Sequence, residues 1–137
     1  MMSNSLVTVD GPTLVKYNMA VDLLEVRRHP ETYPRIGTTQ FPDAVSKMRE
    51  IVYASFLYRN QDTTQDTINF MASALVKEIL ADTELGLKYL SWVEIGRAIR
   101  KAVLGAGSEF YGVSVSTLYK ALVDYAKNEG HEISRKL

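Results

Sequence analysis

The sequence of 137 residues lacks cysteine entirely and contains only two histidines, His29 and His131. The absence of cysteine excludes disulfide frameworks, thiolate zinc sites and cysteine nucleophiles, and it is typical of a reducing compartment. Neither histidine has a second ligand three or four residues away on a shared helix face, so the sequence predicts no metal site. A Ser-His-Asp triad would require the two ends of the chain to converge. We therefore expect no catalytic residues, no metal and no cofactor.

The chain also lacks an excess of charge of either sign and any long hydrophobic run. Sixteen basic residues balance sixteen acidic ones. With no net charge to draw the whole molecule to nucleic acid or to a membrane, such contact requires a local patch. No run approaches the roughly 20 apolar residues that cross a bilayer, and residues 1–10 lack a signal-peptide pattern. We therefore expect a cytoplasmic protein without membrane contact.

What the sequence does contain is amphipathic helical periodicity. Hydrophobic residues make up 46% of the chain and charged residues 23%, which is typical of a globular domain. Apolar residues recur at spacings of three and four in five segments. The fold prediction is all-α, an irregular bundle of about five helices in a single domain over residues 12–130, with a flexible N-terminal arm at 1–11 and a frayed tail at 131–137. The predicted helices span about residues 13–26, 42–59, 65–81, 92–104 and 115–127.

Polar residues and glycines mark several helix ends. Ser91 and Glu94 have the spacing of a capping box, and the segment ending in Gly130 predicts the end of the last helix. Residues 27–42 hold three prolines and predict a loop long enough to be functional or mobile. Residues 82–90 predict a connector, because their one short apolar stretch has no strand to pair with. Other candidate N-caps are Thr63 or Thr64 and Ser114 or Ser116.

Basic residues interleaved with tyrosines lie along the last two predicted helices and the link between them. Such a surface can hold phosphates while a ring stacks on a base. Glu94, Glu109 and Asp124 dilute the charge, and a solvated helix surface is the alternative interpretation. The ten-residue link between the two helices disfavours a standard helix-turn-helix, whose turn has three or four residues. The candidate contact residues are Arg97, Arg100, Lys101, Tyr111, Lys120 and Lys127, with Tyr119 nearby.

Other patterns have simpler explanations. Carboxylate pairs such as Asp22 with Glu25 and Glu78 with Asp82 predict solvated helix faces rather than acid–base couples, which need burial in a cleft. Gly105-Ala106-Gly107 predicts the end of a helix, because phosphate loops place their glycines before one.

The apolar residues predict core filling rather than a ligand pocket. Two helices are apolar around more than half of their circumference, however, and this surplus could serve a homodimer or a partner protein. The methionines and aromatic residues assigned to the core are Met19, Met48, Met71, Tyr53, Phe56, Tyr58 and Phe70.

Residues 89–105, 110–114 and 117–125 resemble a family of small helical proteins encoded by phages and mobile elements of Bacteroidetes. The shared features are a helix containing Glu94-Ile95, a glycine, a Phe110-Tyr111-Gly112 turn and a helix that ends at Tyr125. Residues 106–108 are a departure from that pattern. The functions of the family are largely unassigned, so the resemblance carries over no catalytic residue. It implies a phage or mobile-element protein that acts inside a bacterial cell.

These observations lead to a hypothesis of a non-enzymatic accessory protein that binds nucleic acid or a replication protein. Its contact surface is predicted at Arg97, Arg100, Lys101 and Lys120. The alternative is a small inhibitor that docks on a host defence or regulatory protein through exposed apolar surface and the loop at residues 27–42. A virion component and an enzyme rank below these two.

Overall fold

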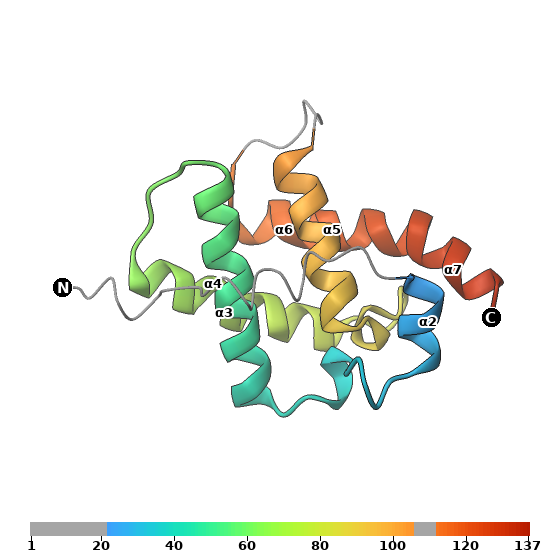
Figure 1. The fold of residues 1–137 in the computed structure, drawn as a ribbon. Coiled ribbons are helices and arrows are strands. Elements are labelled where there is room, and N and C mark those ends of the chain that lie inside the picture. Colours follow the sequence, from blue (N-terminus) through green and yellow to red (C-terminus); the bar gives the residue numbers. More distant parts are fainter. Residues whose placement is uncertain (1–21, 106–111) are drawn as a thin grey trace.

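The structure, a computed structural model, describes residues 22–105 and 112–137, and these residues form helices and connecting turns (Figure 1). No strand occurs among them, and none of their helices is long and apolar enough to cross a membrane. The prediction of an all-α, single-domain bundle of about five helices is confirmed. The elements are α2 (Leu23–Arg28), η2 (Ile36–Thr38), α3 (Phe41–Tyr58), α4 (Gln65–Ala81), η3 (Leu87–Tyr89), α5 (Trp92–Leu104), α6 (Val115–Tyr125), η4 (Ala126–Gly130) and α7 (His131–Arg135).

Four helices build the body of the molecule. Helix α3 packs against both α4 and α5, and α6 packs against both α4 and α5. In Figure 1, α3 and α5 lie side by side and cross α4 and α6, which lie behind them. The elements α6, η4 and α7 follow one another without a break and form the long red rod of Figure 1.

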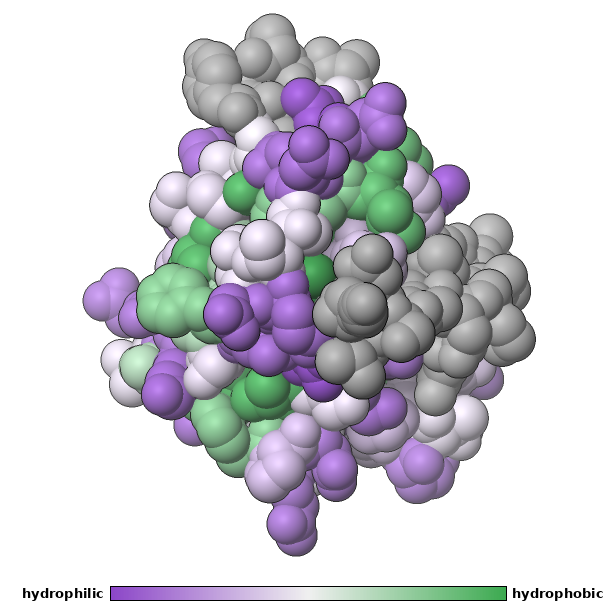
Figure 2. All heavy atoms as spheres, turned by 90° about the vertical axis from the view of Figure 1, so that its left-hand side faces the viewer, coloured by the Kyte–Doolittle hydropathy of each residue, from purple (hydrophilic) through white to green (hydrophobic). Residues whose placement is uncertain are grey.

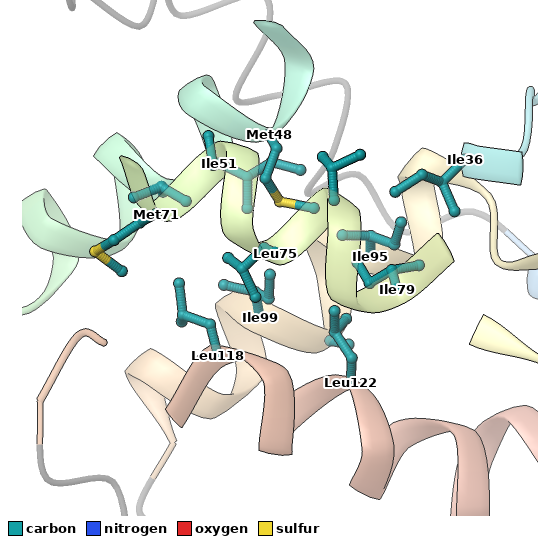
Figure 3. Packing of buried hydrophobic residues seen from close by; sticks show 14 of the residues in the cluster. Ile36, Met48, Ile51, Met71, Leu75, Ile79, Ile95, Ile99, Leu118 and Leu122 are labelled. Carbon is teal, nitrogen blue, oxygen red and sulfur yellow. The ribbon is translucent and has the colours of Figure 1, made fainter. Parts of the chain in front are cut away.

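A single hydrophobic core lies where these four helices meet (Figure 3). Each of the four helices contributes large side chains that are fully buried or nearly so, which is the arrangement that the amphipathic periodicity predicts. The residues labelled in Figure 3 are Ile36, Met48, Ile51, Met71, Leu75, Ile79, Ile95, Ile99, Leu118 and Leu122.

Three of the predicted helix starts are confirmed by side-chain caps. The Ser91 hydroxyl accepts a hydrogen bond from the Glu94 N–H at 3.1 Å, and the Glu94 carboxylate accepts one from the Ser91 N–H at 3.2 Å, which completes a capping box. Thr64 caps α4, and Ser114 caps α6. These polar groups satisfy N–H groups that would otherwise have no partner in the first helical turn.

The first predicted helix differs from the structure. The arm at residues 1–11 and most of the predicted helix at 13–26 lie outside the described residues. Within them, α2 begins only at Leu23, because Asp22 has extended backbone angles (φ −66°, ψ 114°) and its carboxylate accepts from the Leu24 N–H at 3.0 Å. The prediction of a helix that runs unbroken through residue 22 is therefore wrong. Aspartate is a strong N-cap residue, and here the cap prevails over the apolar periodicity.

The end of the last helix is a second correction. Gly130 was predicted to end it, and residues 131–137 were predicted to fray. Instead, α6 continues through the π-helical turn η4 into α7, and Gly130 has right-handed helical angles. The Ser134 hydroxyl accepts a 2.6 Å hydrogen bond from Arg27 Nη1, which ties α7 to α2.

The loop that precedes α3 and the connector that precedes α5 pack against each other. Ile36, in the proline-containing loop, is fully buried, and its N–H donates to the Leu90 carbonyl at 3.0 Å. The Trp92 N–H donates to the Pro34 carbonyl at 3.1 Å, so the loop and the connector form one isolated antiparallel bridge. The loop that was long enough to be functional or mobile therefore has a buried anchor.

Two aromatic residues assigned to the core, Phe70 and Tyr58, lie at the surface instead, together with two leucines. Phe70 is 70% exposed and Leu57 is 55% exposed, while Tyr58 and Leu80 are just over one-third exposed. Figure 2 shows apolar groups between hydrophilic ones on the face that includes the connection of α3 to α4. The assignment of Phe70 and Tyr58 to the core is wrong. Helical spacing predicts on which side of a helix a residue lies, but it does not predict how much of that side a neighbouring helix covers.

Candidate nucleic-acid interface

Helix α5 separates apolar and basic residues onto opposite faces. Ile95, Ile99 and Val103 are buried in the core at spacings of four. Arg100 and Lys101 are exposed on the other side, and Arg97 is half-buried one turn before them. Because residues three and four apart are neighbours on a helix, these three cations form one continuous basic face.

Two adjoining hollows lie beside this face, between α5 and the rod formed by α6 and η4. The first has a volume of about 500 Å³ and is lined by the three cations together with Leu104, Gly105 and Glu129. The second has a volume of about 410 Å³, and alanines of both helices line it. Ala98 and Lys101 of α5 line both hollows, as does Gly105 directly after the helix.

An ion pair crosses between the helices at the boundary of the two hollows. Lys101 Nζ lies 3.1 Å from Glu129 Oε1, and both residues line both hollows. The lysine side chain is 79% exposed and the glutamate side chain 46%. Such exposed pairs contribute at most about 1 kcal/mol to stability, so the two side chains can separate at little cost.

The structure divides the predicted site. Arg97, Arg100 and Lys101 come together, whereas Lys120 and Lys127 lie on the exposed side of the α6–η4 rod and line neither hollow. Lys120 Nζ forms an ion pair with Asp124 Oδ2 at 2.9 Å. Tyr111 lies outside the described residues.

Tyr119 does not lie beside the basic face of α5. Tyr119 belongs to α6, which packs against α4, and it lines neither hollow. Partial burial and the negative charges of Asp82 and Glu78, near the end of α4, raise its pKa. It therefore offers no stacking platform next to Arg97 or Arg100.

Glu94, which was expected to dilute the basic charge at the surface, is fully buried. The Arg27 guanidinium reaches it from α2, with Nε at 2.9 Å from Oε1 and 3.1 Å from Oε2, and Nη2 at 2.8 Å from Oε1. The Tyr125 hydroxyl donates to Oε1 at 2.6 Å from the end of α6. The charge of Glu94 is thus neutralised inside the protein and does not weaken the basic face.

The pKa values of Arg27 and Tyr125 follow from these contacts. Burial disfavours the charged form of Arg27, but the hydrogen bond and attraction of Glu94 outweigh it, and the pKa of Arg27 is raised. Burial and the adjacent carboxylate raise the pKa of Tyr125 far above its ordinary value. Because every oxygen of the carboxylate has donors from within the chain, the cluster is a structural clamp between α2, α5 and α6. The capping-box pattern revealed Ser91 with Glu94, but no local signal pointed to Arg27.

Asp82 also has structural partners within the chain. The Asp82 carboxylate accepts backbone N–H bonds from Leu85 and Leu87 at 3.1 Å and from Glu84 at 3.4 Å. Partial burial opposes the charged form of Asp82, but these bonds outweigh it and lower its pKa. Across residues 22–105 and 112–137, no three His, Asp or Glu side chains are grouped as a metal ion would require. In the Glu78 and Asp82 pair, which was predicted to be a solvated helix face, Asp82 instead binds backbone N–H groups of the connector.

No family model matches the chain, and neither a curated protein nor a solved structure is significantly similar to it.

Proposed function

We propose that this protein is a non-enzymatic accessory protein that binds nucleic acid through Arg97, Arg100 and Lys101 of α5. The observation that carries the proposal is the gathering of these three cations around one surface hollow of about 500 Å³. Of the residues that the structure describes, Glu129 is the one acidic side chain that lines this hollow, so the described lining carries a net charge of plus two. A local positive patch on a chain without net charge attracts phosphates at that place alone.

The mode of contact that we propose is binding to the sugar-phosphate backbone. Phosphate contacts from arginine and lysine position a protein on nucleic acid without reading its sequence. Base stacking needs an exposed aromatic ring beside the cations. Among the described residues, the aromatic side chain that lines these hollows is Tyr125, which is buried and donates its hydroxyl to Glu94. The proposed binding is therefore of low sequence specificity and strongly dependent on salt.

The biological setting of the proposal rests on the resemblance of residues 89–105, 110–114 and 117–125 to helical proteins of Bacteroidetes phages and mobile elements. A protein of that origin would act in the cytoplasm of a bacterial host, next to the machinery that copies the element. We propose a role beside replication, in which the protein contacts nucleic acid or a replication protein bound to it.

The double variant Arg97→Ala with Arg100→Ala tests the proposal. We expect it to weaken binding to a 20-base-pair DNA duplex and to reduce the slope of log K against log salt by about 1.8, or about 0.9 for each lost phosphate contact. Fluorescence anisotropy between 50 and 200 mM salt measures both quantities. The control is Lys77→Ala with Lys88→Ala, which removes the same charge from exposed positions on α4 and η3.

Two results would contradict nucleic-acid binding at this face. One is the absence of binding by the wild-type protein to single-stranded and double-stranded DNA and RNA in low salt. The other is an equal loss of affinity in the α5 double variant and in its control, since this would show only a response to net charge.

A second candidate function is docking on a host defence or regulatory protein. The exposed side chains of Phe70 and Leu57 favour it, because large apolar groups at the surface are typical of protein interfaces. A second copy of this chain is another possible occupant of that surface. Binding of this kind depends little on salt and is sensitive to Phe70→Ser rather than to the α5 arginines.

A further inference from the structure

The ion pair between Lys101 and Glu129 occupies the place where a phosphate would contact Lys101. Lys101 is one of the three cations of the basic hollow, and Glu129 is the acidic residue that lines it. Their charged atoms are 3.1 Å apart. While the pair is closed, one of the three cations is already neutralised by a group of the same chain.

Glu129 reaches this position from η4, the π-helical turn that continues α6. π-Helical turns are rare and occur frequently at functional sites. The next residue, Gly130, is buried and a side chain there would lie 3.3 Å from Arg27 Nη2, so the turn is packed against the Glu94 clamp. The backbone that carries Glu129 is therefore fixed, while its side chain is half exposed and can rotate.

We infer that the pair of Lys101 with Glu129 is an autoinhibitory contact, and that a phosphate group of the bound nucleic acid displaces Glu129 from Lys101. The inference rests on the proposed function, since it concerns the regulation of the same site. Displacement is feasible because an exposed ion pair is worth less than about 1 kcal/mol. A polyanion that already contacts Arg97 and Arg100 presents its next phosphate to Lys101 at high effective concentration.

The variant Glu129→Gln removes the competing charge. We expect it to bind the 20-base-pair DNA duplex about two- to fivefold more tightly than the wild-type protein at 50 mM salt, which corresponds to the free energy of an exposed ion pair. The slope of log K against log salt should stay the same, because Lys101 contacts phosphate in both complexes. Lys101→Gln should reduce that slope by about 0.9 in the wild-type background.

Asp124→Asn is the matched control. It also removes one negative charge from the α6–η4 rod and breaks an exposed ion pair, that of Lys120 with Asp124. Asp124 lines only the second hollow, away from Arg97 and Arg100, so we expect a clearly smaller gain in affinity. All four residues of the two pairs are at the surface, and thermal unfolding of each variant checks that the fold is intact.

The outcomes separate the two proposals. Binding by the wild-type protein with no gain in Glu129→Gln, or with an equal gain in Asp124→Asn, would overturn the autoinhibitory contact and leave nucleic-acid binding standing. A salt slope that steepens by about 0.9 in Glu129→Gln would also overturn it, since Lys101 would then reach phosphate only in the variant. Absence of binding in both proteins would refute both proposals.

Discussion

Glu94 shows how one residue takes a role that its neighbours in sequence do not reveal. As the third residue of α5 it belongs to a capping box with Ser91, which is a local role. Its carboxylate also receives Arg27, 67 positions earlier in the chain, and Tyr125, 31 positions later. A buried carboxylate is stable only with a counter-charge and hydrogen-bond donors, and here both come from distant elements.

Glu94→Gln tests this clamp at the residue scale. The amide keeps the shape of the side chain but leaves the guanidinium of Arg27, whose side chain is 12% exposed, without a counter-charge. We expect a loss of about 3 kcal/mol in the free energy of unfolding, measured by urea denaturation, because breaking a buried ion pair strands the remaining charge. The control Glu132→Gln removes the exposed partner of Arg135 and should cost less than about 1 kcal/mol. Similar losses in the two variants would show that the clamp adds no stability.

At the scale of elements, the helix boundaries set by polar caps were predictable, while the contacts between the connections were not. The serine and threonine caps act on N–H groups three residues away, so their signal is contained in a few neighbouring residues. The loop around η2 and the connector around η3 meet across more than 50 positions of chain. Gly37 lies at this meeting point: a β-carbon there would be 2.6 Å from the Lys88 carbonyl oxygen.

Gly37→Ala is the corresponding prediction for these elements. The added methyl group clashes with a backbone atom, so η2 and η3 must move apart, and Ile36 loses part of its packing. We expect a destabilisation of about 1 to 3 kcal/mol, as for other overpacked sites, measured by thermal or urea unfolding. Thr38→Ala, at an exposed position of the same turn, is the control and should change stability by about 0.5 kcal/mol or less. A neutral Gly37→Ala would mean that the two connections separate without cost.

At the scale of the whole molecule, the clamp links α2 and α7 to the four-helix body. Arg27 contacts both Glu94 in α5 and Ser134 in α7, and Tyr125 closes the cluster from α6. Because Tyr125 is buried against Glu94, the ionisation of its hydroxyl is coupled to global unfolding.

This coupling predicts a loss of stability at alkaline pH. The pKa of Tyr125 is raised in the folded protein by burial and by Glu94, whereas in the unfolded chain it is about 10. Above pH 10 the unfolded state therefore loses this proton while the folded state keeps it, and stability falls with rising pH by up to about 1.4 kcal/mol per pH unit. Urea denaturation between pH 8 and 11 should show a shallower fall for Tyr125→Phe. Equal slopes for the variant and the wild-type protein would contradict the raised pKa.

The sequence by itself determined the helical class, the cap of α5, two candidate caps each for α4 and α6, and the basic face of α5, because each depends on residues within a few positions of one another. Only the tertiary structure decided that Glu94 is buried, that Tyr119 lies near α4 rather than beside the arginines, and that Phe70 is exposed. It also decided that Lys101 faces Glu129 across the hollow. The physical reason is that periodicity orients side chains around one helix axis, whereas burial and pairing depend on which distant surface comes to lie against each face.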